Sequence, residues 1–221
     1  MGKPFYIKDC ALITSMGGVE PAMNLRELRD RITICPVECI YHHFCETVLR
    51  PTFDDPEFRN DFAVWASREL RDRTLAERLG ALNPYLSHDF EQLREEVLAR
   101  IDDRLNEMTM IPWSHRGAEF RFMKAVTVVF DTDIVLSSPG DLSKAISGMT
   151  LSSIYFHFVA ANLRPPKNID DFSNWLSEFG DETVSIIDAL KGIDCYYPTL
   201  AELRKDLITV FSKYGGNTDD R

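Results

Sequence analysis

The chain has 221 residues, of which 44% are hydrophobic and 27% are charged, a composition typical of globular proteins. Its formal net charge of −10 argues against a surface for nucleic acid or for anionic membranes, because both need clustered Lys and Arg. The longest mainly apolar run, Ala125–Phe130, is too short to cross a bilayer.

The cysteine count and the first residues predict the compartment. No signal-peptide core follows Met1, and the five cysteines are an odd number. We therefore expect a cytoplasmic protein whose thiols stay free.

The first half of the chain predicts an extended segment followed by helices. Apolar residues spaced by three and four, Leu25, Leu28 and Ile32, predict an amphipathic helix. Pro51 should end the second helix, because a proline pushes the preceding residue out of the α region. The predicted elements are a strand at Tyr6–Lys8 and helices beginning near Leu25, Pro36, Asp61, Thr74 and His88, the last of which reaches Arg104.

The second half of the chain repeats the first. Several segments recur in the same order, and a self-match of this kind indicates a tandem duplication. The matching pairs are Tyr6–Lys8 with Phe122–Lys124, Ile40–Phe44 with Ile154–Phe158, Leu49–Pro51 with Leu163–Pro165, and Asp61–Trp65 with Asp171–Trp175.

These patterns predict a mainly α protein with a small β component (α+β), built from two tandem pseudo-symmetric repeats packed together. We place the first repeat at residues 1–106, a connector at 107–118 and the second repeat at 119–214. Residues 215–221 are predicted to be a disordered tail, because they are polar and contain two glycines.

The repeated Ile-Tyr-x-His-Phe motif has an apolar face and a polar flank. On an ideal helix Ile40, Tyr41 and Phe44 form one buried stripe, while His43 and Arg50 stack on the side that borders the core. Such side chains should be half-buried and reachable. An arginine there is suited to binding a carboxylate or phosphate, and a histidine beside it supplies a titratable donor.

Two interpretations of this motif remain open. In the first, the repeated residues line ligand pockets. In the second they are architectural: the aromatic rings pack, and each histidine bonds an aspartate, which could instead serve only as a helix cap. The candidate ligand-binding residues are Tyr41, His43, Arg50, Asp61 and Trp65 in the first repeat, and Tyr155, His157, Arg164, Asp171 and Trp175 in the second.

A metal site is a weaker alternative. Cys39 and His43 are four residues apart on one helical face, a spacing that can bind zinc, but the pattern matches no zinc finger or ribbon. The weak candidate ligands are Cys35, Cys39, His42 and His43, and three of them have no counterpart in the second repeat. We therefore predict no metal and no cofactor.

No familiar catalytic motif is present. The sequence contains no Walker loop, no dinucleotide-binding glycine pattern, no H-E-x-x-H and no G-x-S-x-G. Catalytic residues are accordingly not assigned.

The succession Ile-Tyr-x-His-Phe, Leu-Arg-Pro and Asp-Phe-x-x-Trp resembles an uncharacterised family of bacterial and archaeal proteins, a domain of unknown function. The resemblance covers Phe5 to about Phe211. It implies no activity, so no functional residue follows from it.

We expect a non-enzymatic, regulatory cytoplasmic module that binds a small anionic metabolite or a protein partner, and neither nucleic acid nor membrane. One alternative is an enzyme that uses His43 or His157 as a general acid or base on a sugar or phosphate ester. The other is a purely structural protein that forms a homodimer through an apolar patch.

Overall fold

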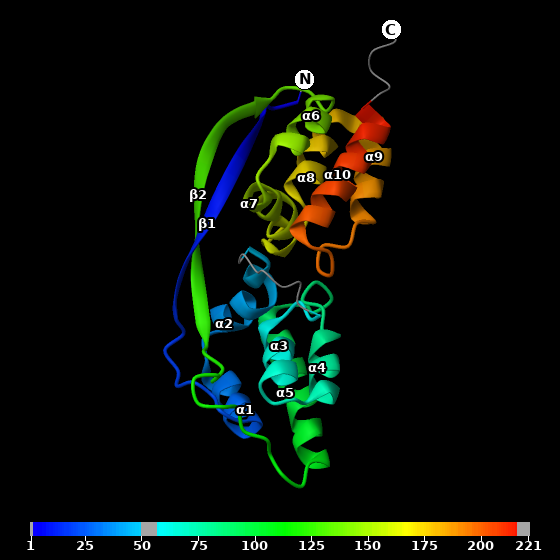
Figure 1. Cartoon of the computed structure of the whole chain (residues 1–221). Helices are drawn as coiled ribbons and strands as arrows, with labels where there is room; N and C mark the ends of the chain where they lie inside the picture. The colour runs from blue at the N-terminus through cyan, green and yellow to red at the C-terminus, as the bar shows by residue number, and fades with distance from the viewer. Residues whose placement is uncertain (1, 50–56, 216–221) are drawn as a thin grey trace. The chain divides into compact units, whose positions relative to one another are not determined.

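The computed structural model describes residues 2–49 and 57–215, apart from the side chains of residues 214 and 215 (Figure 1). The predicted mainly α class with a small β component is confirmed, since helices dominate and two strands form an antiparallel sheet. These strands are β1 (Phe5–Met16) and β2 (Met123–Leu136). Residues 216–221, which make up most of the predicted disordered tail, lie outside the described residues.

The chain divides into two compact units. Unit 1 consists of Met1–Ala11 together with Thr127–Arg221, and unit 2 consists of Leu12–Val126. Both boundaries fall within strands, so β1 and β2 each contribute residues to both units. Residues 1–11, which the sequence pattern assigns to the first repeat, belong to unit 1 together with the C-terminal part of the chain.

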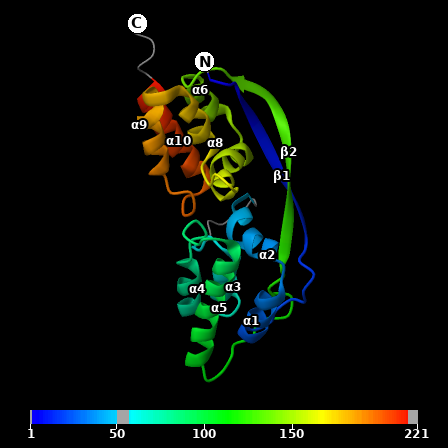
Figure 2. The ribbon, with the colours of Figure 1, turned by 180° about the vertical axis from the view of Figure 1, so that it is seen from behind.

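Unit 2 contains five α-helices among its described residues. α1 buries the predicted Leu25, Leu28 and Ile32, and Asn24 caps it by accepting a hydrogen bond from the Glu27 amide. Figure 2 shows α3, α4 and α5 side by side. The elements are α1 (Leu25–Ile34), α2 (Val37–Tyr41), a π-helical turn (His42–Glu46), a 3-10 turn (Thr47–Leu49), α3 (Asp61–Arg68), α4 (Arg73–Gly80) and α5 (Phe90–Glu107).

Unit 1 has a similar order of elements. Thr150 caps α7, and a π-helical turn again follows that helix. The elements are α6 (Asp141–Gly148), α7 (Leu151–Ile154), the π-helical turn (Tyr155–Val159), a 3-10 turn (Ala161–Leu163), α8 (Asp171–Leu176), a 3-10 segment (Ser177–Thr183), α9 (Val184–Lys191) and α10 (Leu200–Gly215).

The caps of α3 and α8 lie one residue before the predicted positions. Asn60 accepts a hydrogen bond from the Ala63 amide at 2.9 Å, and Asp170 accepts one from the Ser173 amide at 2.7 Å. Burial raises the pKa of the Asp170 carboxyl. Asp61 and Asp171 are therefore the first residues of their helices, which leaves both carboxylates available for other partners.

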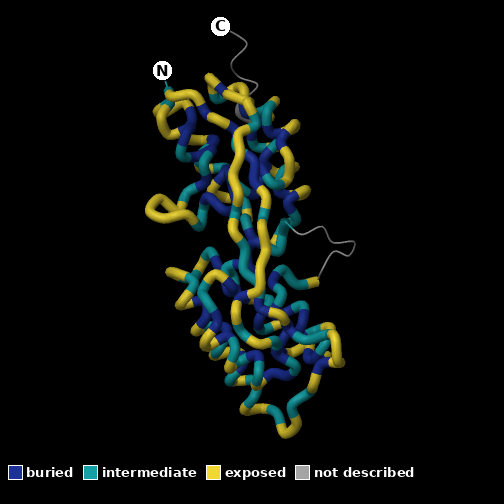
Figure 3. Tube along the Cα trace, turned by 90° about the vertical axis from the view of Figure 1, so that its left-hand side faces the viewer, coloured by how far each residue is buried: buried dark blue, intermediate teal, exposed yellow. Residues whose placement is uncertain are grey.

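The buried residues are concentrated in the helical parts of the chain, whereas Val128 and Phe130 on β2 are 41% and 48% exposed (Figure 3). In unit 2 the rings of Phe62 and Phe120 stack at 4.8 Å between centroids. Within the described residues, no helix combines the length and the apolar character needed to cross a membrane.

Asn60 connects two helices of unit 2, and its removal should be costly. Its side chain is fully buried, caps α3 and donates a hydrogen bond to the Leu79 carbonyl at 3.0 Å. Asn60→Ala leaves that carbonyl and the Ala63 amide without these partners, so we expect the free energy of unfolding to fall by about 2 kcal/mol. Urea denaturation measures the loss. Asp89→Ala removes the exposed cap of α5 and should cost less; equal losses would contradict this account.

Candidate functional site

His157 of unit 1 is 2% exposed, and both of its ring nitrogens have partners. The Lys8 backbone N–H donates to Nε2 at 2.8 Å, and Nδ1 lies 2.8 Å from the Asp171 carboxylate. A backbone amide can only donate, so Nε2 carries no proton. The hydrogen bonds therefore assign the ring proton to Nδ1, which donates to Asp171.

His43 of unit 2 has the same arrangement. It is 2% exposed, and its Nε2 accepts the Met123 backbone N–H at 2.9 Å. Its Nδ1 lies 2.6 Å from the Asp61 carboxylate. The same reasoning assigns the proton to Nδ1. In each unit an imidazole thus connects a strand amide to a helix carboxylate.

In each unit a tryptophan bonds the main chain five residues before the strand amide that the histidine accepts. In unit 1 the Trp175 indole N–H donates to the Lys3 carbonyl at 2.6 Å. The ring of Phe5 lies between these two contacts, 5.1 Å from the His157 ring and 5.3 Å from the Trp175 ring. The segment Lys3–Lys8 is therefore fixed at both ends and in the middle.

Unit 2 holds Ala118–Met123 in a corresponding way. The Trp65 indole N–H donates to the Ala118 carbonyl at 2.7 Å, and the Phe120 ring lies 4.8 Å from the His43 ring and 5.7 Å from the Trp65 ring. We call Lys3–Lys8 and Ala118–Met123 the anchored segments.

The contacts pair the two anchored segments one residue differently from the sequence match. That match aligned Lys8 with Lys124, whereas the histidine contacts pair Lys8 with Met123. The same spacing pairs Phe5 with Phe120, whose rings have corresponding contacts. The sequence comparison missed this because the shared features are largely main-chain groups, which leave little trace in residue identity.

Arg164 lies beside its predicted neighbour His157, and both contact the same aspartate. Its Nη2 donates to Asp171 Oδ2 and to the Phe156 carbonyl, each at 2.8 Å. Its guanidinium also lies 4.4 Å above the centre of the Phe156 ring. The Arg164 guanidinium thus already has hydrogen-bond and ion-pair partners in the same unit. Its predicted counterpart, Arg50, lies outside the described residues.

The prediction that the histidines are half-buried and reachable was wrong, since both are 2% exposed. On an ideal α-helix with an uncovered flank, both histidines would be half-buried. The motif instead continues in a π-helical turn, and the anchored segments cover the imidazoles. Tyr155 is fully buried, while Tyr41 is half-buried with its ring edge-on to Phe90.

The weak metal candidates have other partners. A hydrogen bond between the thiols of Cys35 and Cys39 raises the pKa of Cys35 and lowers the pKa of Cys39. His42 Nδ1 lies 2.7 Å from the buried Glu46 carboxylate, and His43 contacts Asp61. Across residues 2–49 and 57–215, no three His, Cys, Asp or Glu side chains are arranged to hold a metal ion.

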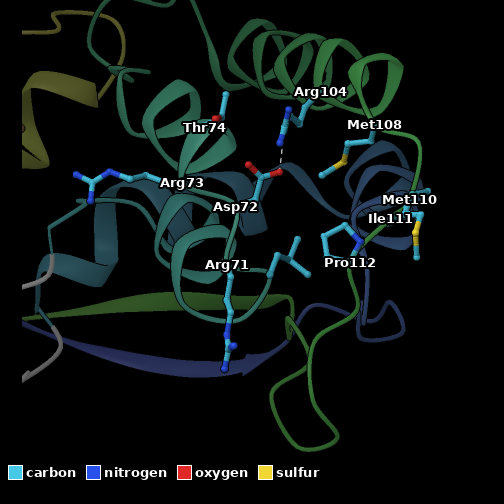
Figure 4. Close-up of a pocket in the computed structure, with 10 residues that line it drawn as sticks. Arg71, Asp72, Arg73, Thr74, Arg104, Met108, Met110, Ile111 and Pro112 are labelled. Atoms are coloured by element: carbon cyan, nitrogen blue, oxygen red, sulfur yellow. Dashed lines mark hydrogen bonds and ion pairs between the residues drawn. The ribbon is translucent and has the colours of Figure 1, made fainter.

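Unit 2 contains an open cavity of about 500 Å³, lined by residues outside the repeated motifs (Figure 4). Its centre is the buried Asp72, which accepts hydrogen bonds from the Leu75 amide at 3.0 Å and from Arg104 Nε at 2.8 Å. The lining residues come from the chain before α4, the start of α4, the end of α5 and the chain that follows it: Leu70, Arg71, Asp72, Arg73, Thr74, Arg104, Met108, Met110, Ile111 and Pro112.

Two more arginines flank the cavity. Arg73 is bound by Glu57 and Glu77, each at 2.9 Å. Arg71 is exposed, has a left-handed backbone with φ of 54°, and forms no ion pair with any residue that the structure describes. In Figure 4 both side chains extend away from the Asp72–Arg104 pair, in different directions.

Comparisons with known proteins give a fold relationship and no activity. A profile described as a family of unknown function (DUF5752) matches residues 2–212. Among solved structures, OrfY from Thermoproteus tenax is similar, with 28% sequence identity and a TM-score of 0.78, over 96% of this chain and 95% of that chain. No curated protein matches the sequence significantly.

The histidines should contribute strongly to stability. His157→Ala leaves the Lys8 amide without its acceptor and opens a space beside Phe5, and His43→Ala does the same beside Phe120. We expect each change to lower the free energy of unfolding by about 3 kcal/mol. Denaturant unfolding tests this, with His88→Ala as a control, since the His88 side chain is 88% exposed. If all three variants were equally stable, the anchoring role would be refuted.

Proposed function

Because the chain belongs to the family of unknown function DUF5752, its role must be inferred from its own residues, and we propose that it is a non-enzymatic module that binds a small anionic molecule in the cavity beside α4. The observation that carries this proposal is Arg71, a cation at the cavity without an ion-pair partner among the described residues. Its exposed guanidinium is suited to binding a carboxylate or phosphate.

The charge around the cavity supports an anionic ligand. The whole chain has a net charge of −10, yet the cavity lining contains three arginines and a single carboxylate. That carboxylate, Asp72, is already bonded to Arg104 and to the Leu75 amide. Arg73 and Arg104 are paired with carboxylates, so Arg71 is the cation that a ligand anion would meet here. The apolar side chains of Met108 and Ile111 provide a wall for the ligand's remaining atoms.

The hydrogen bonds of His43 and His157 support a non-enzymatic role. A general acid or base needs a ring nitrogen within reach of substrate. In both residues Nε2 accepts a strand amide and Nδ1 faces an aspartate. Proton transfer through either ring would first require an anchored segment to detach.

The proposal places this module in the cytoplasm. None of the five cysteines forms a disulfide bond. Burial raises the pKa of Cys45 and of Cys195, that of Cys195 to about 12. Cysteines without disulfide bonds are typical of a reducing compartment.

Arg71→Gly is the sharpest test of the cavity. Glycine adopts a positive φ without strain, so this variant removes the guanidinium without disturbing the backbone. We expect wild-type protein to gain thermal stability from at least one member of a panel of small phosphate and carboxylate compounds. The variant should bind that compound about tenfold more weakly, as expected for a lost charged hydrogen bond.

Asn168→Gly is the matched control, since Asn168 also has a positive φ, of 48°, and lies in unit 1. It should bind the compound as wild type does. Absence of any shift across the panel would contradict the proposal, and so would an unchanged affinity in Arg71→Gly.

A further inference from the structure

The anchored segment Lys3–Lys8 is held in unit 1 as an extended peptide is held in a receptor groove. The groove contacts main-chain atoms at both ends, through the Trp175 indole and the His157 ring. Between them Phe5 lies against the rings of His157, Phe172 and Trp175, at 5.1, 5.6 and 5.3 Å. We call the surface formed by these three residues the strand groove.

Unit 2 indicates which features of a segment such a groove requires. Its own groove holds Ala118–Met123, whose sequence Ala-Glu-Phe-Arg-Phe-Met differs from Lys-Pro-Phe-Tyr-Ile-Lys. Both segments have Phe at the third position and a buried apolar residue at the fifth, Ile7 at 2% and Phe122 at 0% exposure. The two segments thus share a main-chain path and two buried side chains.

The intervening positions contribute little to this selection. Tyr6 in the first segment is 55% exposed, and the corresponding Arg121 is also exposed. Because side chains alternate along a strand, only every second residue enters the groove. Any chain that supplies the same main-chain path with Phe and an apolar residue two positions later meets these requirements.

We propose that the strand groove of unit 1 is a receptor for extended segments with Phe followed two residues later by an apolar residue, and that a second copy of this chain supplies such a segment by exchanging its Lys3–Lys8. A donated copy makes the same contacts with Trp175, His157 and Phe172 as the chain's own segment, so exchange sacrifices none of them. Main-chain bonding with side-chain selection is also how strand-addition complexes form.

The chain's own segment has the advantage of being covalently attached, which gives it a high effective concentration. Exchange is therefore expected at high protein concentration, or where the resident segment is weakened. This proposal is independent of the cavity beside α4, since its contacts all lie in unit 1.

A peptide experiment tests the receptor in the full-length protein. Phe5→Ala weakens the resident segment and should lower Tm. A synthetic peptide of residues 2–9 should then raise Tm of this variant by at least about 3 °C in a concentration-dependent manner. A peptide of residues 117–124 should also raise it, and the residue 2–9 peptide with Phe5→Ala should not. If Phe5→Ala does not fold, Phe5→Leu takes its place, and binding of the fluorescently labelled peptide to it is measured by anisotropy.

A mixing experiment tests exchange between copies. Phe5→Ala has a weakened segment and an intact groove, whereas Trp175→Leu has an intact segment and a weakened groove. Mixed at high concentration, the two should form a dimer by light scattering, in which one copy donates the intact segment to the other's intact groove. Each alone should form less dimer. No peptide shift would overturn the receptor, and a mixture with no more dimer than its components would overturn exchange.

Discussion

Within each unit, the packing of the strand against the helices depends on one interaction, in which a strand amide donates a hydrogen bond to the Nε2 atom of a buried histidine. Because a backbone N–H can only donate a hydrogen bond, the imidazole must accept at Nε2 and carry its own proton on Nδ1. That proton needs an acceptor at a buried site, and Asp61 and Asp171 provide it. A buried ring with either nitrogen unpaired would lower stability. The histidine, the aspartate and the strand amide therefore depend on one another for their hydrogen bonds.

This requirement explains several neighbouring residues. Since Asp61 and Asp171 serve the histidines, the caps of α3 and α8 come from Asn60 and Asp170. Arg164 donates to the same oxygen of Asp171, which leaves it bound within the protein. Arg71 differs because it forms no ion pair within the described part of the chain and lies at a cavity, so it is the arginine on which ligand binding is proposed.

The sequence predicted those elements whose cause is local. The spacing of Leu25, Leu28 and Ile32 located α1. The cap before α3 was placed at Asp61 instead of Asn60 because adjacent Asn and Asp residues are both good caps. The motif singled out the correct histidines, but their burial was underestimated, because neither the π-helical turns nor the covering segments follow from ideal helical geometry. Main-chain donors such as the Lys8 amide, and a cavity assembled from residues 70–74 and 104–112, carry no sequence motif at all.

The position of the ring proton in His43 and His157 is the most direct test of this account. Long-range ¹H–¹⁵N correlation spectra of the folded protein distinguish the two neutral tautomers, and a coupling across the hydrogen bond links the Lys8 amide nitrogen to Nε2 of His157. We predict the Nδ1-protonated tautomer for both residues and a coupling of this kind for each strand amide. A proton on Nε2 of either ring, with a rapidly exchanging amide at Lys8 or Met123, would contradict the account.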